Sequence, residues 1–149
     1  MRIKGRIGPS NLAYFDCQVK GTDPAFSLPT TMIADTGASR TAILHKDASQ
    51  LNLNYSHLEL AGKVGGIGGS RTAYWLKGVT IGFASSEPAN YEESLDRILV
   101  FRTWARTEKR KFELFRLPSV IGIDILAKYR ITFPGRGIRD SDVFLDLEA

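Results

Sequence analysis

Over residues 1–7 and 14–19, apolar side chains alternate with charged or polar ones, and residues 8–11 have the composition of a turn. A period of two places every second side chain on one face of a half-buried strand. The short apolar run at residues 32–34 fits a buried strand that leads into Asp35. The first third of the chain therefore predicts β-structure.

The rest of the chain continues this pattern. Two strands joined by a glycine-rich tip are predicted over residues 59–83, and shorter strands over 41–44, 97–101, 119–121, 131–133 and 143–147. Short helices are predicted over residues 47–51 and 123–129, the second with Asp124 near its start, where a carboxylate suits the helix dipole. The polar stretch at about 84–117 is predicted to be an insertion. We see no internal repeat and expect one domain over residues 1–149.

Length and composition fit a globular protein. The 149 residues can bury a sizeable core, and the 43% hydrophobic and 24% charged residues are ordinary values. No stretch approaches the ~20 apolar residues that span a bilayer, and the first six residues lack the apolar run of a signal peptide. We therefore expect a cytoplasmic protein without a membrane partner.

The net charge of +4 arises largely from one basic cluster. Its members are Arg102, Arg106, Lys109, Arg110, Lys111 and Arg116. Such a cluster can meet phosphates, but a solvated surface is the commoner role of basic residues. Nucleic acid is therefore not expected as a partner, and steeply salt-dependent retention on DNA or RNA would indicate the opposite.

Cysteine and histidine are scarce. Cys17 is the only cysteine, which excludes an intrachain disulfide, and its place on the apolar side of a strand predicts a buried structural thiol. His45 and His57 are the only histidines and are predicted to lie at the surface. No histidine–cysteine cluster has the spacing of metal ligands, and no nucleophile elbow is present. No metal or cofactor is expected.

Three segments carry the candidate chemistry, and the first is residues 33–39. It places Asp35 between an apolar strand and the small residues of a turn, beginning with Thr36 and Gly37. Such a turn can hold a carboxylate at the floor of a cleft, while the glycine lets a ligand backbone come close. Alone, an Asp-Thr-Gly string is more often an ordinary structural turn.

The second segment has four glycines in five residues. They are Gly65, Gly66, Gly68 and Gly69, with Ile67 between them. The segment predicts the tip of a β-hairpin whose backbone amides can contact a ligand. A phosphate-binding loop is less consistent, because no Lys-Ser/Thr pair and no helix pattern follow it; a plain turn stays open. The third segment, residues 120–126, is an apolar strand, a glycine and a short helix.

In this order the three segments resemble retropepsin-like aspartic proteases, the family of retroviral proteases and their cellular relatives. The family pattern is an apolar pair before Asp-Thr-Gly-Ala/Ser, a glycine-rich flap, and an apolar pair with glycine before a short helix. It is matched over about residues 32–133. The resemblance implies a closed all-β barrel of the acid protease fold, with one or two short helices, and an aspartic endopeptidase activity.

The resemblance also implies a role for each matching residue. Asp35 would be the catalytic aspartate, Thr36 would lock two active-site loops across a dimer axis, and Gly37 would present its backbone to the substrate. Residues 65–69 would form the flap over a bound peptide. Gly122 would pack beneath the active-site turn.

The chain departs from the family near the expected substrate subsites. Many members carry Arg where this chain has Ile123 and an acid where it has Ser39, and in retroviral members these two groups form an ion pair. The aspartate that often follows that acid is replaced by Arg40. These departures also support a second hypothesis, a catalytically inactive binding module that kept the fold.

A single Asp-Thr-Gly string implies a dimer. An aspartic protease needs two neighbouring carboxylates, because the ionised one takes a proton from water while the protonated one polarises the carbonyl. The resemblance therefore implies a homodimer with one Asp35 from each subunit and a protein or peptide substrate. If the termini interleave as in retroviral relatives, residues 143–149 are needed for the dimer. Because Ala38 cannot donate the hydrogen bond that serine donates to the ionised carboxylate, activity is predicted at about pH 4 to 6.5.

Overall fold

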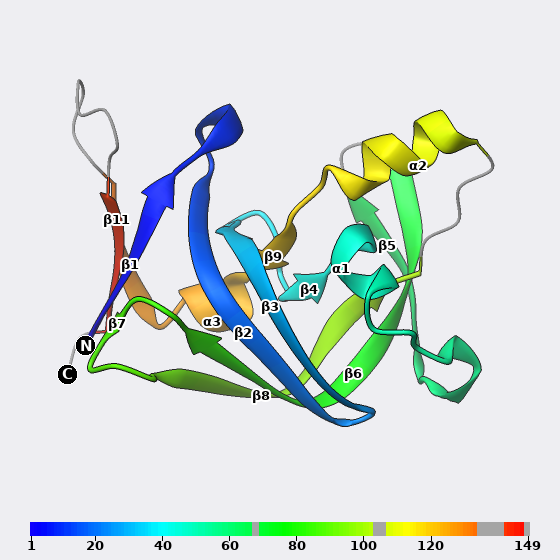
Figure 1. The fold of residues 1–149 in the computed structure, drawn as a ribbon, viewed down its shortest axis with the longest axis horizontal. Helices are drawn as coiled ribbons and strands as arrows, with labels where there is room; N and C mark the ends of the chain where they lie inside the picture. The colour runs from blue at the N-terminus through cyan, green and yellow to red at the C-terminus, as the bar shows by residue number, and fades with distance from the viewer. Residues whose placement is uncertain (67–68, 103–106, 134–141, 148–149) are drawn as a thin grey trace.

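The computed structural model describes residues 1–66, 69–102, 107–133 and 142–147, which form a mostly β protein (Figure 1). The strands are β1 (Arg2–Ile7), β2 (Ala13–Asp23), β3 (Ala25–Ala34), β4 (Ala42–Ile43), β5 (Leu60–Gly66), β6 (Gly69–Phe83), β7 (Ser86–Glu87), β8 (Glu92–Phe101), β9 (Ser119–Ile121), β10 (Tyr129–Thr132) and β11 (Asp142–Leu147). The α-helices are α1 (His45–Ser49), α2 (Glu108–Phe115) and α3 (Ile123–Leu126), and short 3-10 helices lie at Pro9–Asn11 and Tyr55–His57. None of the helices in these ranges is long and apolar enough to cross a membrane.

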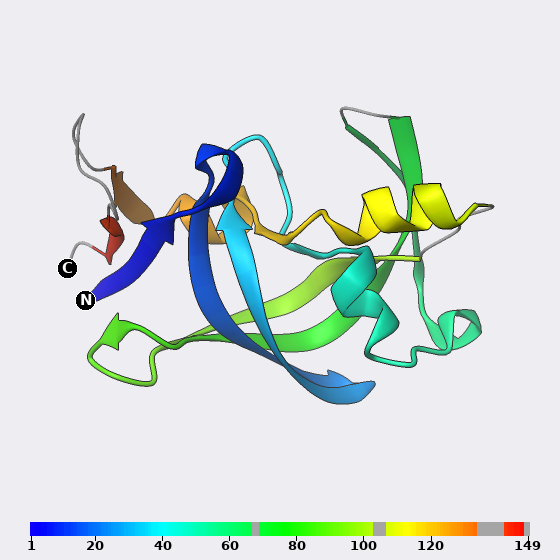
Figure 2. The same ribbon diagram turned by 45° about the horizontal axis from the view of Figure 1, so that its top comes forward.

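Six strands close into a barrel. Hydrogen-bonded neighbours follow the order β2, β3, β9, β4, β8 and β6, and β6 pairs back onto β2. The alternation predicted from the sequence explains the closure, because β2 turns Phe15, Cys17 and Val19 into the core and its polar residues outward. In Figure 2 the long β2–β3 hairpin crosses in front of β6 and β8. The predicted all-β class with a closed barrel is confirmed.

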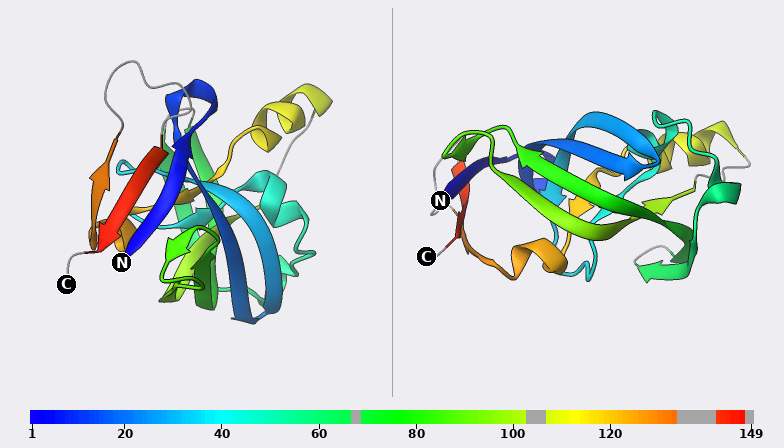
Figure 3. Two further views of the ribbon diagram at one scale, coloured as in Figure 1. Left: turned by 60° about the vertical axis from the view of Figure 1, so that its left-hand side comes forward. Right: turned by 90° about the horizontal axis from the view of Figure 1, so that it is seen from below.

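A smaller group of strands lies beside the barrel, at the end of the molecule that holds both termini (Figure 3). β11 pairs antiparallel with β1 over Arg2–Arg6 and, on its other edge, with β10 over Tyr129–Thr132. Ile3, Val143 and Leu145 of this group are fully buried. Both edges of β11 are therefore paired within one chain.

Part of the stretch predicted to be an insertion belongs to the barrel. β8 pairs antiparallel with β6 through nine of its ten residues and in parallel with β4. Its charged start misled the sequence prediction, since Glu93 is buried and accepts hydrogen bonds from Lys128 and Tyr129 instead of facing solvent. α2 occupies the connection from β8 to β9.

The two predicted helices form with other boundaries. α1 begins at His45, two residues before the predicted start, because the chain turns as soon as β4 ends at Ile43. α3 ends at Leu126 instead of continuing to Tyr129. Tyr129 starts β10, and its hydroxyl binds the buried Glu93 carboxylate, which draws the chain out of the helix.

Candidate active site

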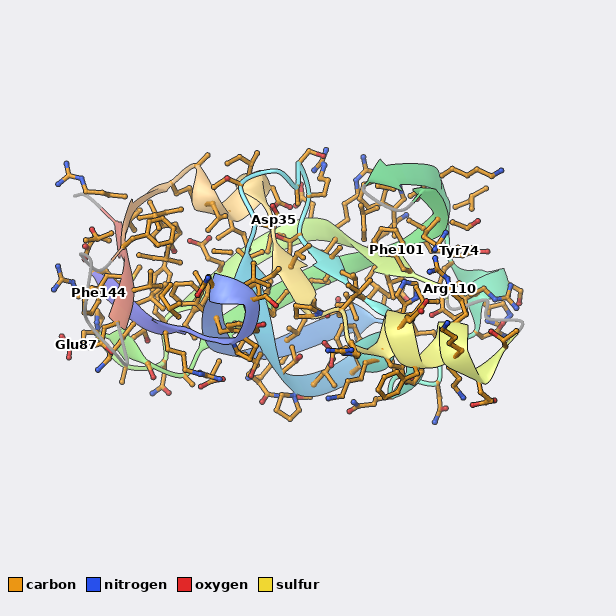
Figure 4. All side chains as sticks on the ribbon, turned by 90° about the horizontal axis from the view of Figure 1, so that it is seen from above. Asp35, Tyr74, Glu87, Phe101, Arg110 and Phe144 are labelled. Carbon is orange, nitrogen blue, oxygen red and sulfur yellow. The ribbon has the colours of Figure 1, made fainter. Side chains whose placement is uncertain are left out.

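Asp35 follows β3, which pairs in parallel with β9. The Asp35 amide donates to the Ile121 carbonyl in β9 at 3.0 Å, and the Ala38 amide closes the turn onto the Asp35 carbonyl at 3.1 Å. The strand end is anchored in the core by Met32, whereas Asp35 is only partly buried. In Figure 4 Asp35 lies between the terminal strands, where Phe144 is labelled, and the α2 end of the molecule.

The turn holds the Asp35 carboxylate from one side. The Gly37 amide donates to Asp35 Oδ1 at 2.9 Å, and a Cβ at Gly37 would lie 3.1 Å from the same oxygen. Within the described part of the chain, Oδ2 accepts no hydrogen bond from the protein. Thr36 and Gly37 are exposed, so their backbone is open to a ligand. One carboxylate oxygen is positioned and the other is free to act.

Gly122 supports the turn from below, as the family resemblance implies. A Cβ at this glycine would lie 2.4 Å from the carbonyl carbon of Arg40 and 2.8 Å from the Thr41 nitrogen. No other residue allows so close an approach of two backbones. The Gly122 amide donates to Thr41 Oγ1 at 3.0 Å, and the Ile123 amide donates to the Ala38 carbonyl at 2.8 Å.

Asp124 clamps the far end of the same loop. Both of its carboxylate oxygens lie 3.0 Å from the Thr41 amide, and Thr41 Oγ1 donates to Oδ1 at 2.7 Å. Thr41 is fully buried, so this carboxylate satisfies a backbone donor that water cannot reach. From the sequence, Asp124 was expected only to complement a helix dipole. No sequence signal joins Asp124 to Thr41, because the two residues are 83 positions apart and the burial of Thr41 is seen only in the structure.

A second polar network ties α1 to the strands below the site. Asp47 Oδ2 accepts from Ser119 Oγ at 2.6 Å and from Thr30 Oγ1 at 2.7 Å, and Ser119 Oγ accepts from the Leu44 amide at 3.0 Å. Asp47 and Ser119 are both buried. Sequence analysis assigned no role to these residues, and their contacts join β3, β9 and α1.

The predicted glycine-rich hairpin is present as β5 and β6. The two strands pair from Leu60 up to Gly66 opposite Gly69, while Ile67 and Gly68, the centre of the predicted tip, lie outside the described residues. Gly62 has φ of +107° beside a register shift, and a Cβ at Gly65 would meet nothing within 4 Å. The hairpin thus has open space around its backbone near the tip.

His45 is buried, so its predicted surface position is wrong. Only 2% of the residue is exposed, and its ring lies 6.1 Å from that of Phe101. Burial lowers the pKa of His45, and the nearby Arg71 of β6 and Arg110 of α2 lower it further. Figure 4 shows Arg110 and Phe101 at the same end of the molecule. The histidine starts α1, where the apolar side of β8 covers it.

Other catalytic chemistry finds no support among the described residues. They contain no group of three or more His, Cys, Asp or Glu side chains that could hold a metal ion. Cys17 is buried, as predicted, and burial raises the pKa of its thiol to about 12. A thiol that stays protonated is a poor nucleophile. The partly exposed Asp35 carboxylate, with its ordered oxygen, is the group in the described chain best placed for chemistry.

The chain is similar to aspartic proteases in sequence and in fold. Residues 16–91 match the model of a family described as aspartyl protease, and no curated protein matches. A retropepsin-like aspartic protease from Rickettsia conorii superposes with a TM-score of 0.53 at 16% identity, over 97% of this chain and 90% of that chain. EIAV protease complexed with the inhibitor HBY-793 gives 0.52 at 17% identity, over 80% and 89%. At these identities the structural likeness shows the fold, which is retropepsin-like.

Proposed function

The chain belongs to the aspartyl protease family, and from this premise we propose that it is a homodimeric endopeptidase that cleaves peptide bonds with two copies of Asp35. The observation that carries the proposal is the position of the Asp35 carboxylate. It stands at the end of a buried strand, with Oδ1 held by the Gly37 amide at 2.9 Å and with an open turn beside it.

The second carboxylate comes from a second copy of the chain. Asp-Thr-Gly occurs once in the sequence, and two like charges at short range share one proton, which is the known behaviour of aspartic protease pairs. In the dimer the ionised Asp35 takes a proton from water, and the protonated one polarises the substrate carbonyl. The exposed Thr36 then faces its copy across the two-fold axis and locks the two loops.

The substrate is a protein or peptide chain in extended form. It lies between the Asp35 floor and the β5–β6 hairpin, which acts as a flap. The backbone of residues 65–69 closes over it with main-chain hydrogen bonds of the kind that an added strand makes. The Ile67 amide helps to hold a water on the substrate carbonyls. A cytoplasmic location stays a prediction from the sequence.

Cleavage of a mixed peptide library between about pH 4 and 7 tests the proposal, with wild type beside Asp35→Asn. We expect cleavage by wild type and a loss of about 10²- to 10⁴-fold in the variant, because the amide can neither take nor share the proton. Circular dichroism and sedimentation control for folding and for the dimer. If dimeric wild-type protein cleaves nothing, the proposal is wrong and the inactive binding module takes its place.

A further inference from the structure

A cavity of about 380 Å³ lies beside the active-site loop. Its walls come from three elements that the site already uses: Arg40 at the end of the loop, residues 94–97 of β8, and Asp124 with Lys128 at α3. Arg40 is exposed and Arg97 is half-buried. The cavity is thus open to solvent and continuous with the loop that carries Asp35.

Two arginines of this cavity share one aromatic ring. The Arg97 guanidinium lies 3.9 Å from the centre of the Trp75 ring, and the Arg40 guanidinium lies 5.7 Å from it. Neither forms an ion pair or a side-chain hydrogen bond within the described part of the chain. Stacking on an indole orients a guanidinium and leaves its N–H donors free at the rim.

The acidic groups nearby are largely engaged elsewhere. Asp124 is held by Thr41, and Glu59, which Arg97 approaches closely enough to lower its pKa after the larger effect of Lys77, pairs with Lys77 at 2.7 Å. Asp96 is exposed at the cavity wall. Two guanidinium groups therefore border the cavity beside the carboxylates of Asp96 and Asp124, and of these two acids only Asp96 accepts no hydrogen bond from the described part of the chain.

The cluster joins the floor of the site to the hairpin above it. Arg40 follows Asp35 by five residues, and its backbone rests on Gly122. Trp75 belongs to β6, the strand that continues into the hairpin tip, and pairs with Leu99 of β8. The peptide of the proposed function lies between the floor and the hairpin, and the cluster takes residues from both the loop of the floor and the strand of the hairpin.

We propose that Arg40, Trp75 and Arg97 form a subsite that binds an acidic side chain of the substrate, some residues away from the cleaved bond. The inference rests on the proposed function and adds the substrate class. A two-fold dimer carries this subsite twice. The preference for Asp or Glu therefore occurs on both sides of the cleaved bond.

The first experiment reads cleavage sites from a library of natural peptides by mass spectrometry, followed by synthetic pairs with Glu or Gln at the enriched position. Wild type favours the Glu peptide about fivefold in kcat/KM, the upper range for a partly exposed ion pair. Arg40→Gln and Arg97→Gln each lower this ratio, and Arg40→Glu reverses it. Lys111→Gln, which removes an exposed charge from α2, leaves the ratio unchanged.

The second experiment does not depend on turnover. A scanning set of extended peptide pairs, identical except for Glu or Gln at one position, is titrated onto Asp35→Asn protein. The affinity ratio of each pair is measured at low salt and at about 0.5 M salt, where screening weakens exposed charge pairs. A Glu preference that disappears in Arg40→Gln supports the subsite. Equal affinities for the Glu and Gln peptides of every pair overturn the subsite, even when the wild type cleaves both peptides. If the protein binds the Glu peptide more tightly but the wild type cleaves neither, the proposed function is overturned and the subsite stands.

Discussion

The floor and the hairpin of the site are built in opposite ways. Residues 35–41 are fixed by hydrogen bonds: they donate to a carbonyl of β9 and to the Asp124 carboxylate, and they accept from the amide of Gly122. The hairpin has less support. Ala61 and Val64 of β5 pack against a small buried cluster at its base, but β5 pairs only with β6 among the described residues, and Leu60 is 61% exposed.

The difference shows which part of the site needs precise positioning. The proposed sharing of a proton between two copies of Asp35 requires each carboxylate to be placed within fractions of an ångström, and the loop that carries it has fixed partners. A cover that admits a peptide must open, and regions with few buried contacts open at low free energy. The comparison can be tested by changing one residue at a time on each side.

The largest effect is expected for Gly122→Ala. The new Cβ would meet the backbone of Arg40 and Thr41 at 2.4 to 2.8 Å, and neither backbone can move without shifting the turn that holds Asp35. We expect the free energy of unfolding to fall by about 3 kcal/mol, with loss of peptide cleavage. Urea denaturation measures the first and the peptide library the second. A variant as stable and active as wild type would show that the backbone around Gly122 can move apart without displacing Asp35.

Asp124→Ala comes next. It leaves the buried Thr41 amide and hydroxyl without their acceptor, which costs about 2 kcal/mol for bonds to a charged group. The matched variant Asp124→Asn keeps one acceptor oxygen and should lose about half as much. Denaturation curves and kcat are compared for both. If wild type and both variants have the same free energy of unfolding and the same kcat, Asp124 does not hold the loop through Thr41.

His45, which lies where α1 meets arginines of β6 and α2, predicts a smaller, pH-dependent effect. In the unfolded chain His45 gains a proton as the pH falls through its ordinary value of 6.5, but in the folded protein its lowered pKa delays this. The unfolded state then binds more protons, so the free energy of unfolding falls as the pH drops below 6.5.

The comparison with His45→Gln isolates this contribution. Between about pH 5 and 6.5 the stability of the variant should depend less on pH than that of wild type. The carboxylates with lowered pKa values, such as Glu93 and Asp146, lose their contribution only below their ordinary values near 4. Parallel stability curves in that window would exclude His45 as the cause.

Gly65→Ala should have the smallest effect. Nothing lies within 4 Å of the added Cβ, so the free energy of unfolding should change by less than about 0.5 kcal/mol. This variant is the matched control for Gly122→Ala, since both replace glycine by alanine and differ only in surroundings. A loss above about 1 kcal/mol would mean that the hairpin is packed more tightly than the structure shows.

The floor was largely predictable from the sequence, because its signals are local. An apolar run before Asp35 predicts a strand and a turn, and another before Gly122 predicts a strand and a short helix. The structure has a turn after β3, and α3 after β9. Their contact with each other followed only from the family resemblance. The roles of Thr36, Ile67 and Gly68 stay predictions.

The missed features depend on distant pairings. Asp124 and Thr41 are 83 residues apart, and no spacing rule joins them. The burial of His45 depends on the packing of α1 against the end of β8, where its ring lies 6.1 Å from that of Phe101; both elements were predicted in part, but their contact was not. The register of β2 on β6, which closes the barrel, likewise depends on residues far apart in the chain.

Because β11 pairs with β1 and with β10 of the same chain, the folding of one chain does not require the proposed dimer. Each chain can therefore reach its native state alone, and the proposed dimer then adds stability that rises with protein concentration. The proposed activity also obeys mass action, because half a site has no turnover. Under the proposal, dilution dissociates the dimer and abolishes the activity while each chain stays folded. A high local concentration of the chain restores the dimer and the activity.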